Sequence, residues 1–157
     1  MLRKLLRALF RPRPPPPPPR PADPRLEADP WLGRIFELLP ARYQLGADAP
    51  DGTQILRRTG RARFNPMQLW LKTAERVVRG DYEVRGDPVA ARTTLDARVS
   101  GRLASLGLAP TSESVQDWGG KVLTRRYEGR CDAPDQAAAA IRFFCEDSEQ
   151  QLNLASE

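Results

Sequence analysis

Few residue types in this chain could carry out acid–base or metal chemistry. The 157 residues include no histidine, which is the commonest general base and the commonest metal ligand. Cys131 and Cys145 are the two cysteines, and their separation matches no metal-ligand spacing. No histidine is present to activate either thiol. The sequence therefore predicts no catalytic residue, no metal site and no cofactor, with Cys145 buried as an inert thiol on an apolar stripe.

Catalytic sequence motifs are missing as well. The nucleophile elbow GxSxG, the P-loop, the dinucleotide fingerprint GxGxxG and the zinc motif HExxH do not occur. Acidic pairs such as Asp81 with Glu83, and Glu27 with Asp29, resemble ordinary surface pairs because no partner residue accompanies them. We therefore expect a protein that is not an enzyme.

A cluster of basic residues is the strongest candidate for a binding site. Residues 54–79 carry seven basic side chains against Glu75, a net charge of +6. The cluster consists of Arg57, Arg58, Arg61, Arg63, Lys72, Arg76 and Arg79. It could bind an anion or a partner protein, or it could be a solvated hairpin tip whose charges pair with acidic residues elsewhere. The cluster lacks a named nucleic-acid motif and has few interleaved aromatic residues.

The net charge of +5 is unevenly distributed along the chain. Residues 1–25 carry seven basic side chains and Asp23, a net charge of +6, whereas residues 26–157 have a net charge of −1. The body therefore lacks the overall positive charge expected of a DNA-binding domain.

Residues 1–11 form a cationic amphipathic segment. Leucines and one phenylalanine follow the spacing of one helical face, and the basic residues lie mostly off that face. This pattern is typical of a helix in a membrane interface, although a disordered basic tail or an organelle presequence would look similar. The predicted membrane contacts are Leu2, Arg3, Lys4, Leu5, Leu6, Arg7, Leu9, Phe10 and Arg11. We expect reversible attachment to an anionic membrane surface, because about 20 apolar residues would be needed to span a bilayer.

Residues 12–25 are rich in proline and predict a semi-rigid linker. Pro14–Pro19 favour polyproline II, and the ten residues from Pro12 to Pro21 would extend roughly 30 Å. The same run satisfies PxxP with flanking arginines, which SH3-like domains recognise. We favour the spacer interpretation because any proline run creates PxxP by chance.

Four helices are predicted from proline at a helix start preceded by a capping side chain. Asp29-Pro30, Asn65-Pro66 and Asp87-Pro88 provide this signal, and Asp132-Ala133-Pro134 is a looser version. The expected ranges are 30–39, 66–79, 88–106 and 133–152, with Gly80 ending the second helix.

Strands are predicted around glycine-containing turns. Gly119-Gly120 lies between two runs, and the second run alternates, which is the pattern of a β-hairpin. Residues 53–64 are a second candidate hairpin with its turn near Thr59-Gly60, and residues 81–84 could add a short strand.

Together these features predict an α+β protein: a small antiparallel sheet of one or two hairpins packed against three to four helices. The predicted organisation is an amphipathic segment (1–11), a proline-rich linker (12–25) and one globular domain (26–157), with the N-terminal part disordered. The predicted function is a non-catalytic, adaptor-like protein-interaction domain in the cytoplasm, held peripherally on a membrane and not secreted. The alternative is a nucleic-acid-associated protein that uses the basic N-terminal segment and the arginine cluster at residues 57–79.

Overall fold

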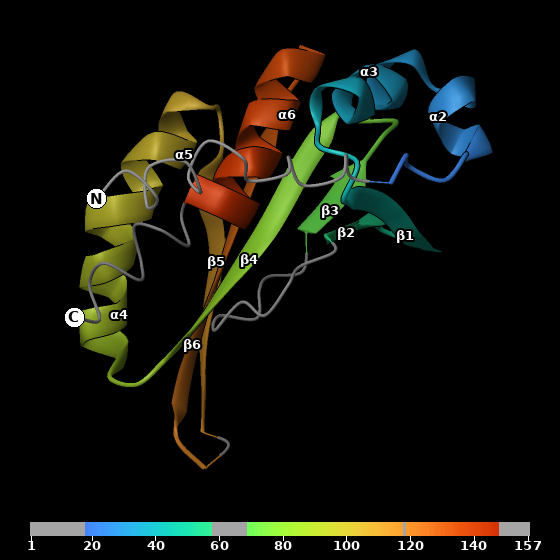
Figure 1. Cartoon of the computed structure of the whole chain (residues 1–157). Coiled ribbons are helices and arrows are strands. Elements are labelled where there is room, and N and C mark those ends of the chain that lie inside the picture. Colours follow the sequence, from blue (N-terminus) through green and yellow to red (C-terminus); the bar gives the residue numbers. More distant parts are fainter. Residues whose placement is uncertain (1–17, 58–68, 118, 148–157) are drawn as a thin grey trace, which may run out of the picture.

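The computed structural model describes residues 18–57, 69–117 and 119–147, which form an α+β fold (Figure 1). The strands are β1 (Tyr43–Ala49), β2 (Gly52–Arg57), β3 (Leu69–Lys72), β4 (Val77–Arg85), β5 (Ala109–Asp117) and β6 (Lys121–Arg130). The helical segments are α2 (Pro24–Ala28), α3 (Pro30–Leu38), α4 (Pro88–Leu95), η1 (Asp96–Ser100), α5 (Gly101–Ser105), α6 (Pro134–Arg142) and η2 (Phe143–Asp147). The α+β class predicted from the sequence is confirmed.

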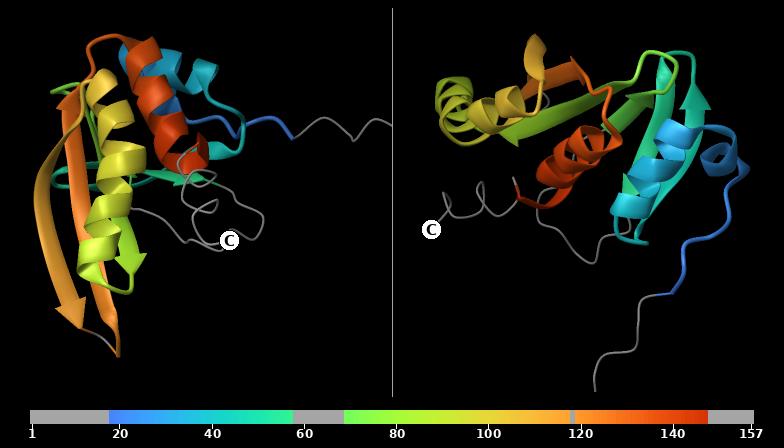
Figure 2. Two further views of the ribbon diagram at one scale, coloured as in Figure 1. Left: turned by 90° about the vertical axis from the view of Figure 1, so that its left-hand side faces the viewer. Right: turned by 90° about the horizontal axis from the view of Figure 1, so that it is seen from above.

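The six strands form one sheet in the order β1-β2-β3-β4-β6-β5, and every pairing is antiparallel. The sheet is therefore larger than the predicted one or two hairpins. It is strongly twisted, and the helices lie on one side of it (Figure 2). In Figure 1, α4 and α5 accompany the β5–β6 half, α6 crosses the middle, and α3 lies at the end with β1–β3.

The Asp-Pro helix starts are confirmed. The Asp29 carboxylate accepts hydrogen bonds from the backbone N–H groups of Trp31 and Leu32, and α3 begins at Pro30. Asp87 caps α4 in the same way, since it accepts from the N–H groups of Val89 and Ala90. A carboxylate at this position satisfies backbone donors that have no partner within the helix. These two local signals therefore located two of the helices correctly.

The long C-terminal helix is confirmed over its described part. Its predicted range corresponds to α6 and η2 up to Asp147, and residues 148–152 lie outside the described residues. The N-cap residue is Ala133, which makes no side-chain cap. The range 88–106 likewise corresponds to the consecutive segments α4, η1 and α5.

The predicted helix over residues 66–79 is wrong. Residues 69–72 form β3, residues 77–79 belong to β4, and a turn at Thr73–Arg76 joins the two strands. Arg76 has a φ of 54°, which reverses the chain in the left-handed region. The apolar side chains of Leu69 and Leu71 alternate along a strand and are buried. The helical interpretation instead placed Leu71 on one face with Trp70 and Val77, across the turn.

Gly80 lies in the middle of β4 and does not end a helix. A Cβ atom at this position would lie 2.6 Å from two ring carbons of Phe144 in η2. The missing side chain lets the C-terminal helical segment pack directly on the sheet. The strand predicted at residues 81–84 is confirmed as part of β4.

The hairpin around Gly119-Gly120 is confirmed and longer than predicted. β5 and β6 pair from Ala109↔Glu128 to Asp117↔Lys121. For the other predicted hairpin, the first arm is confirmed as β2, while the turn and the second arm lie outside the described residues. Thr53 and Ile55 of β2 pair with β1 on one side and β3 on the other. Strand β1 was not predicted.

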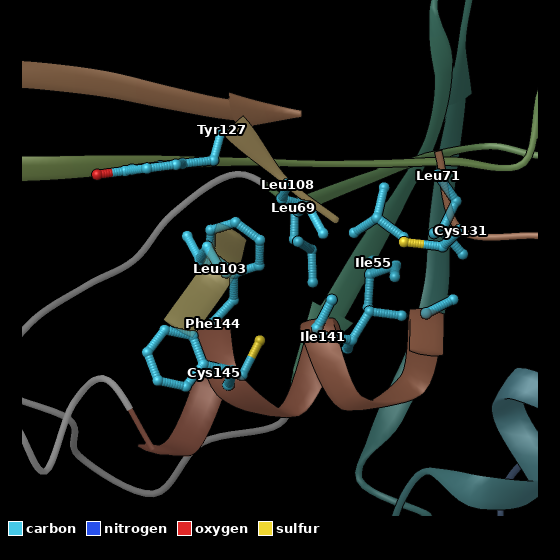
Figure 3. Close-up of a cluster of buried hydrophobic side chains, with 14 of the residues drawn as sticks. Ile55, Leu69, Leu71, Leu103, Leu108, Tyr127, Cys131, Ile141, Phe144 and Cys145 are labelled. Atoms are coloured by element: carbon cyan, nitrogen blue, oxygen red, sulfur yellow. The ribbon is translucent and has the colours of Figure 1, made fainter. Parts of the chain in front are cut away.

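The core lies between the helices and the sheet (Figure 3). Ile141 and Phe144 of the C-terminal helical segments point toward Leu69 and Tyr127 on the strands. All four side chains are at most 2% exposed. Both cysteines are buried, as predicted for Cys145, and burial raises the pKa of the Cys131 thiol to about 11. This core fixes the strands that carry the candidate site on their other face.

The described chain begins to contact the domain before residue 26. The Arg20 guanidinium donates to the carbonyl oxygens of Phe36, Leu39, Pro40 and Tyr43 at 2.5–3.0 Å. Its carbon lies 4.9 Å from the centroid of the Phe36 ring. These contacts fix the end of the proline-rich stretch at the C-terminus of α3. The division of the chain at residues 11 and 25 stays a prediction.

Candidate protein-interaction face

The face of the sheet opposite the helices carries mostly polar side chains. The register of β3, β4 and β6 places the buried Leu71, Val78 and Tyr127 toward the helices and the alternate residues on the opposite face. The central residues of this face are Trp70, Lys72, Arg79, Asp81, Arg126 and Glu128, which we call the polar sheet face.

Cross-strand ion pairs neutralise most charges on the polar sheet face. The Asp81 and Arg126 side chains form two parallel hydrogen bonds of 2.8 and 2.9 Å between β4 and β6. The Asp81 carboxylate raises the pKa of Arg126 through these bonds. Lys72 Nζ lies 3.5 Å from Glu128 Oε1. The Asp81–Arg126 pair joins neighbouring strands, where opposite charges stabilise the sheet and fix its register. The Lys72–Glu128 pair joins β3 and β6 across β4.

Arg79 is the most unusual side chain on the polar sheet face. Its side chain is only 8% exposed, and its guanidinium carbon lies 5.3 Å from the centroid of the Trp70 ring. One guanidinium nitrogen lies 2.6 Å from Asp51 Oδ2, and this bond holds the pKa of Asp51 below its ordinary value. Within the described residues, neither Arg79 Nε nor Trp70 Nε1 has a hydrogen-bond acceptor, although both atoms are buried. Buried donors without acceptors are costly, so an acceptor placed here would be stabilising.

A shallow cleft adjoins this arrangement. It has a volume of about 480 Å³ and lies between the β1–β2 turn, which contains Asp51, and the β3–β4 turn. Lys72 belongs to both the cleft and the polar sheet face. The cleft is lined by the carboxylates Asp48, Asp51 and Glu75 together with Lys72, and by smaller residues that include Thr73 and Ala74. This geometry suits an extended peptide segment more than an enclosed small molecule.

The structure brings together part of the predicted basic cluster. Lys72 and Arg79 lie on the polar sheet face, Arg76 lies in the β3–β4 turn, and Arg57 is the last residue of β2. Arg58, Arg61 and Arg63 lie outside the described residues, as do the predicted membrane contacts at residues 2–11. Lys72, Arg76 and Arg79 each have a carboxylate partner: Glu128, Asp132 and Asp51 respectively.

Sequence reasoning missed the acidic half of the site. Asp51, Asp81 and Glu128 come from three separate strands or turns, and only the register brings them to the basic residues. Arg125 and Arg126 are adjacent in β6, and strand alternation places them on opposite faces of the sheet. Arg126 faces the polar side, whereas Arg125 points toward the helices and pairs with Asp96 and Glu113 at 2.6 and 2.8 Å.

The described residues hold neither a candidate metal site nor a membrane-spanning helix. Residues 18–57, 69–117 and 119–147 contain no group of three metal-ligating side chains. In the same ranges, every helix is too short or too polar to cross a bilayer.

Comparison with known proteins identifies no family for this chain. No family model matches the sequence, and no curated protein matches it. Among solved structures, the chain is similar to the crystal structure of YbjN from E. coli, a proposed transcription regulator, with 13% sequence identity and a TM-score of 0.37. The alignment covers 85% of this chain and 87% of YbjN.

Proposed function

We propose that residues 26–157 form a non-catalytic, adaptor-like domain that binds another protein at the polar sheet face and the adjoining cleft. Residues 1–11 would hold this domain reversibly on an anionic membrane surface, and the prolines before Arg20 would set its distance from that surface.

The observation that carries the partner-binding proposal is the arrangement of Arg79 on Trp70. Arginine and tryptophan are the side chains most often found at the energetic centre of protein interfaces. The two buried donors, Arg79 Nε and Trp70 Nε1, have no acceptor within the described residues. A main-chain carbonyl or a carboxylate of a partner would satisfy them, after a small displacement of the side chains around them.

The pairing of the basic residues favours a protein partner over a nucleic acid. Affinity for nucleic acid comes from cations that replace counterions on phosphates. Lys72, Arg76 and Arg79 already neutralise carboxylates of the same chain, with N–O distances of 3.5, 4.0 and 2.6 Å. The described part of the basic cluster is therefore a mixed-charge surface, as is common at protein interfaces.

Capture by the full-length protein tests the partner site. Ala74 is exposed and lines the cleft, so Ala74→Glu adds bulk and charge there. Ala104 on α5 is also exposed, and Ala104→Glu is the matched control. We expect a partner, identified by mass spectrometry, that the wild type and Ala104→Glu retain at least about tenfold more than Ala74→Glu. Equal retention by all three proteins would contradict the location of the site.

Sedimentation with anionic liposomes tests the membrane contact. Replacing Leu5, Leu6 and Leu9 by serine leaves the charge unchanged and removes apolar area. We expect this variant to be lost from the liposome pellet that contains the wild type. Equal sedimentation of both proteins would exclude the apolar face as an anchor. A salt-dependent gel shift with DNA would instead support the nucleic-acid alternative.

A further inference from the structure

Strand β5 is an outer strand of the sheet with nothing paired to its outer edge among the described residues. It is the terminal strand in the sheet order, and all nine of its residues are exposed. An exposed edge strand presents unpaired N–H and C=O groups, which form a template for another strand.

One row of β5 side chains has a defined charge pattern. Glu113, Val115 and Asp117 alternate along the strand and give an acidic–apolar–acidic row. On the inner side this row pairs with β6, where Arg125, Leu123 and Lys121 give the complementary basic–apolar–basic row. Val115 remains 43% exposed. A second strand with the same basic–apolar–basic alternation would therefore suit the outer side of β5.

The N-terminal segment of this chain contains that alternation twice. Arg3, Leu5 and Arg7 form one basic–apolar–basic row, and Arg7, Leu9 and Arg11 repeat it. In an extended conformation these five residues lie on one side of the strand. Placed antiparallel with Leu9 opposite Val115, the segment brings Arg7 to Asp117 and Arg11 to Glu113.

We propose that residues 3–11 of a second copy of this chain add to the β5 edge as a seventh, antiparallel strand. Main-chain hydrogen bonds would provide the affinity. The Arg7–Asp117 pair would fix the register, because Glu113 already pairs with Arg92 and Arg125 at 2.6 and 2.8 Å, and Arg11 would join that cluster. Reciprocal exchange between two copies gives a closed dimer with two identical contacts. This inference concerns self-association and does not depend on the membrane or partner-binding proposals.

The position of Arg20 favours a second copy over the same chain. Arg20 donates to the Tyr43 carbonyl of β1, at the opposite end of the sheet from β5. The five interstrand steps between those ends span about 24 Å in a straight line through the sheet. The nine residue steps from Arg11 to Arg20 cover about 28 Å in polyproline II. The linker of one chain is therefore barely longer than this straight line. It is too short to pass around the domain and align residues 3–11 along β5 of the same chain.

The native mass of the full-length protein in lipid-free buffer tests the proposal. Analytical ultracentrifugation at micromolar concentration is expected to give about twice 17.6 kDa for the wild type. Val115→Lys should raise the dissociation constant of the dimer at least about tenfold, because lysine places a charge opposite the basic arm. Leu56→Lys is the matched control, since Leu56 is 44% exposed at the other end of the sheet, and it should remain dimeric.

A charge-reversed arm provides an independent variant that leaves the folded domain unchanged. The triple change Arg3→Glu, Arg7→Glu and Arg11→Glu should also give a monomer. Mixing it with Val115→Lys should restore a heterodimer, because one copy then contributes an intact edge and the other an intact arm. Asp117→Lys replaces Val115→Lys if circular dichroism shows that the latter is unfolded.

Three results would overturn the proposal: a monomeric wild type, a dimer that survives reversal of the arm, or a mixture that stays monomeric. The second result would indicate direct pairing of two β5 edges. Val115→Lys should still sediment with anionic liposomes as the wild type does, so failure of the membrane proposal would be seen separately.

Discussion

The two edge strands of the sheet, β1 and β5, differ in what contacts their outer sides. At β1, arginine side chains from the preceding segment donate to main-chain carbonyls: Arg20 to Tyr43 and Arg25 to Gly46, both at 3.0 Å. At β5, all nine residues are exposed, and β6 is the one described neighbour. The first edge has side-chain donors bound to it, and the second has its outer side open.

This difference shows how a few arginines can block one edge of a sheet. A carbonyl that already accepts from a guanidinium is a poor site for a new strand, and charged residues are a common device at sheet edges. Arg25 also pairs with Asp23 and Asp48, at 2.7 and 2.9 Å, so it is held in place over β1. The β1 edge should therefore be inert, and association should occur at β5.

The largest expected effect comes from Gly129, which positions the start of β5. A Cβ at Gly129 would lie 2.0 Å from the carbonyl oxygen of Gly107, just before β5. Gly129→Ala should therefore lower the free energy of unfolding by about 3 kcal/mol, measured by denaturant titration. Hydrogen exchange should speed up more in β5 than in β1.

Gly101→Ala is the control for this change. Gly101 begins α5, and a Cβ there would meet no atom within 4 Å. Alanine is the better helix former, so stability should rise by up to about 1 kcal/mol. A loss of stability equal to that of Gly129→Ala would show that the contact with Gly107 is not the cause.

A smaller effect is expected at the β1 edge, to which the Arg20 side chain donates. Arg20→Ala leaves four carbonyl oxygens without their guanidinium donor, and we expect a loss of about 2 kcal/mol in the free energy of unfolding. Arg34→Ala removes an exposed ion pair with Glu37 and should leave the free energy of unfolding almost unchanged. Similar values for the two variants would mean that Arg20 does not anchor the segment.

At the β5 edge, low pH should weaken the ion pairs of Glu113 with Arg92 and Arg125. The guanidinium of Arg92, and then that of Arg125, hold the pKa of Glu113 below its ordinary value of 4.5. A carboxylate with a depressed pKa in the folded state stabilises the fold above its unfolded pKa, and this stabilisation is lost as the pH falls through the folded pKa. The melting temperature of Glu113→Gln should therefore decline less between pH 7 and pH 3 than that of the wild type.

The control for the acid experiment is Glu37→Gln, which changes an exposed pair on α3. Its pH profile should run parallel to that of the wild type. If both variants flatten the profile equally, the effect reflects total charge and not the contacts of Glu113.

The smallest effect concerns the two lysine variants at opposite ends of the sheet. Leu56 and Val115 are 44% and 43% exposed, so lysine at either position should change the free energy of unfolding by less than about 0.5 kcal/mol. Thermal unfolding at a concentration where the wild type is monomeric measures this directly. A large loss at Val115 alone would mean that the residue supports the fold, and its effect on association would then be indirect.

The parts of the fold that could be predicted from sequence are those with local signals. Asp29 and Asp87 mark helix starts through their own hydrogen bonds, and Gly119 and Gly120 both have positive φ values in the β5–β6 turn. These residues determine structure within a few positions of themselves, so the starts of α3 and α4 and this hairpin could be predicted.

Residues 69–79 could not be assigned from their pattern. The segment is short, and its apolar residues fit one helical face as well as two strands. The β1–β2 turn did have a local signal, since Pro50-Asp51-Gly52 is a typical turn sequence that could have revealed β1. The carboxylate partners of Lys72 and Arg79 depend on strand register, which is a property of the whole sheet.

The anchoring of Arg20 also has a consequence for how this chain can vary. Arg20 follows the uninterrupted prolines and fixes the backbone beside α3, so the folded domain begins from the same point whatever precedes it. Prolines could be gained or lost before Arg20 without disturbing the domain, and each would change the reach of the segment by about 3.1 Å. The length of the proline run is therefore a parameter that evolution or protein engineering could adjust independently of folding.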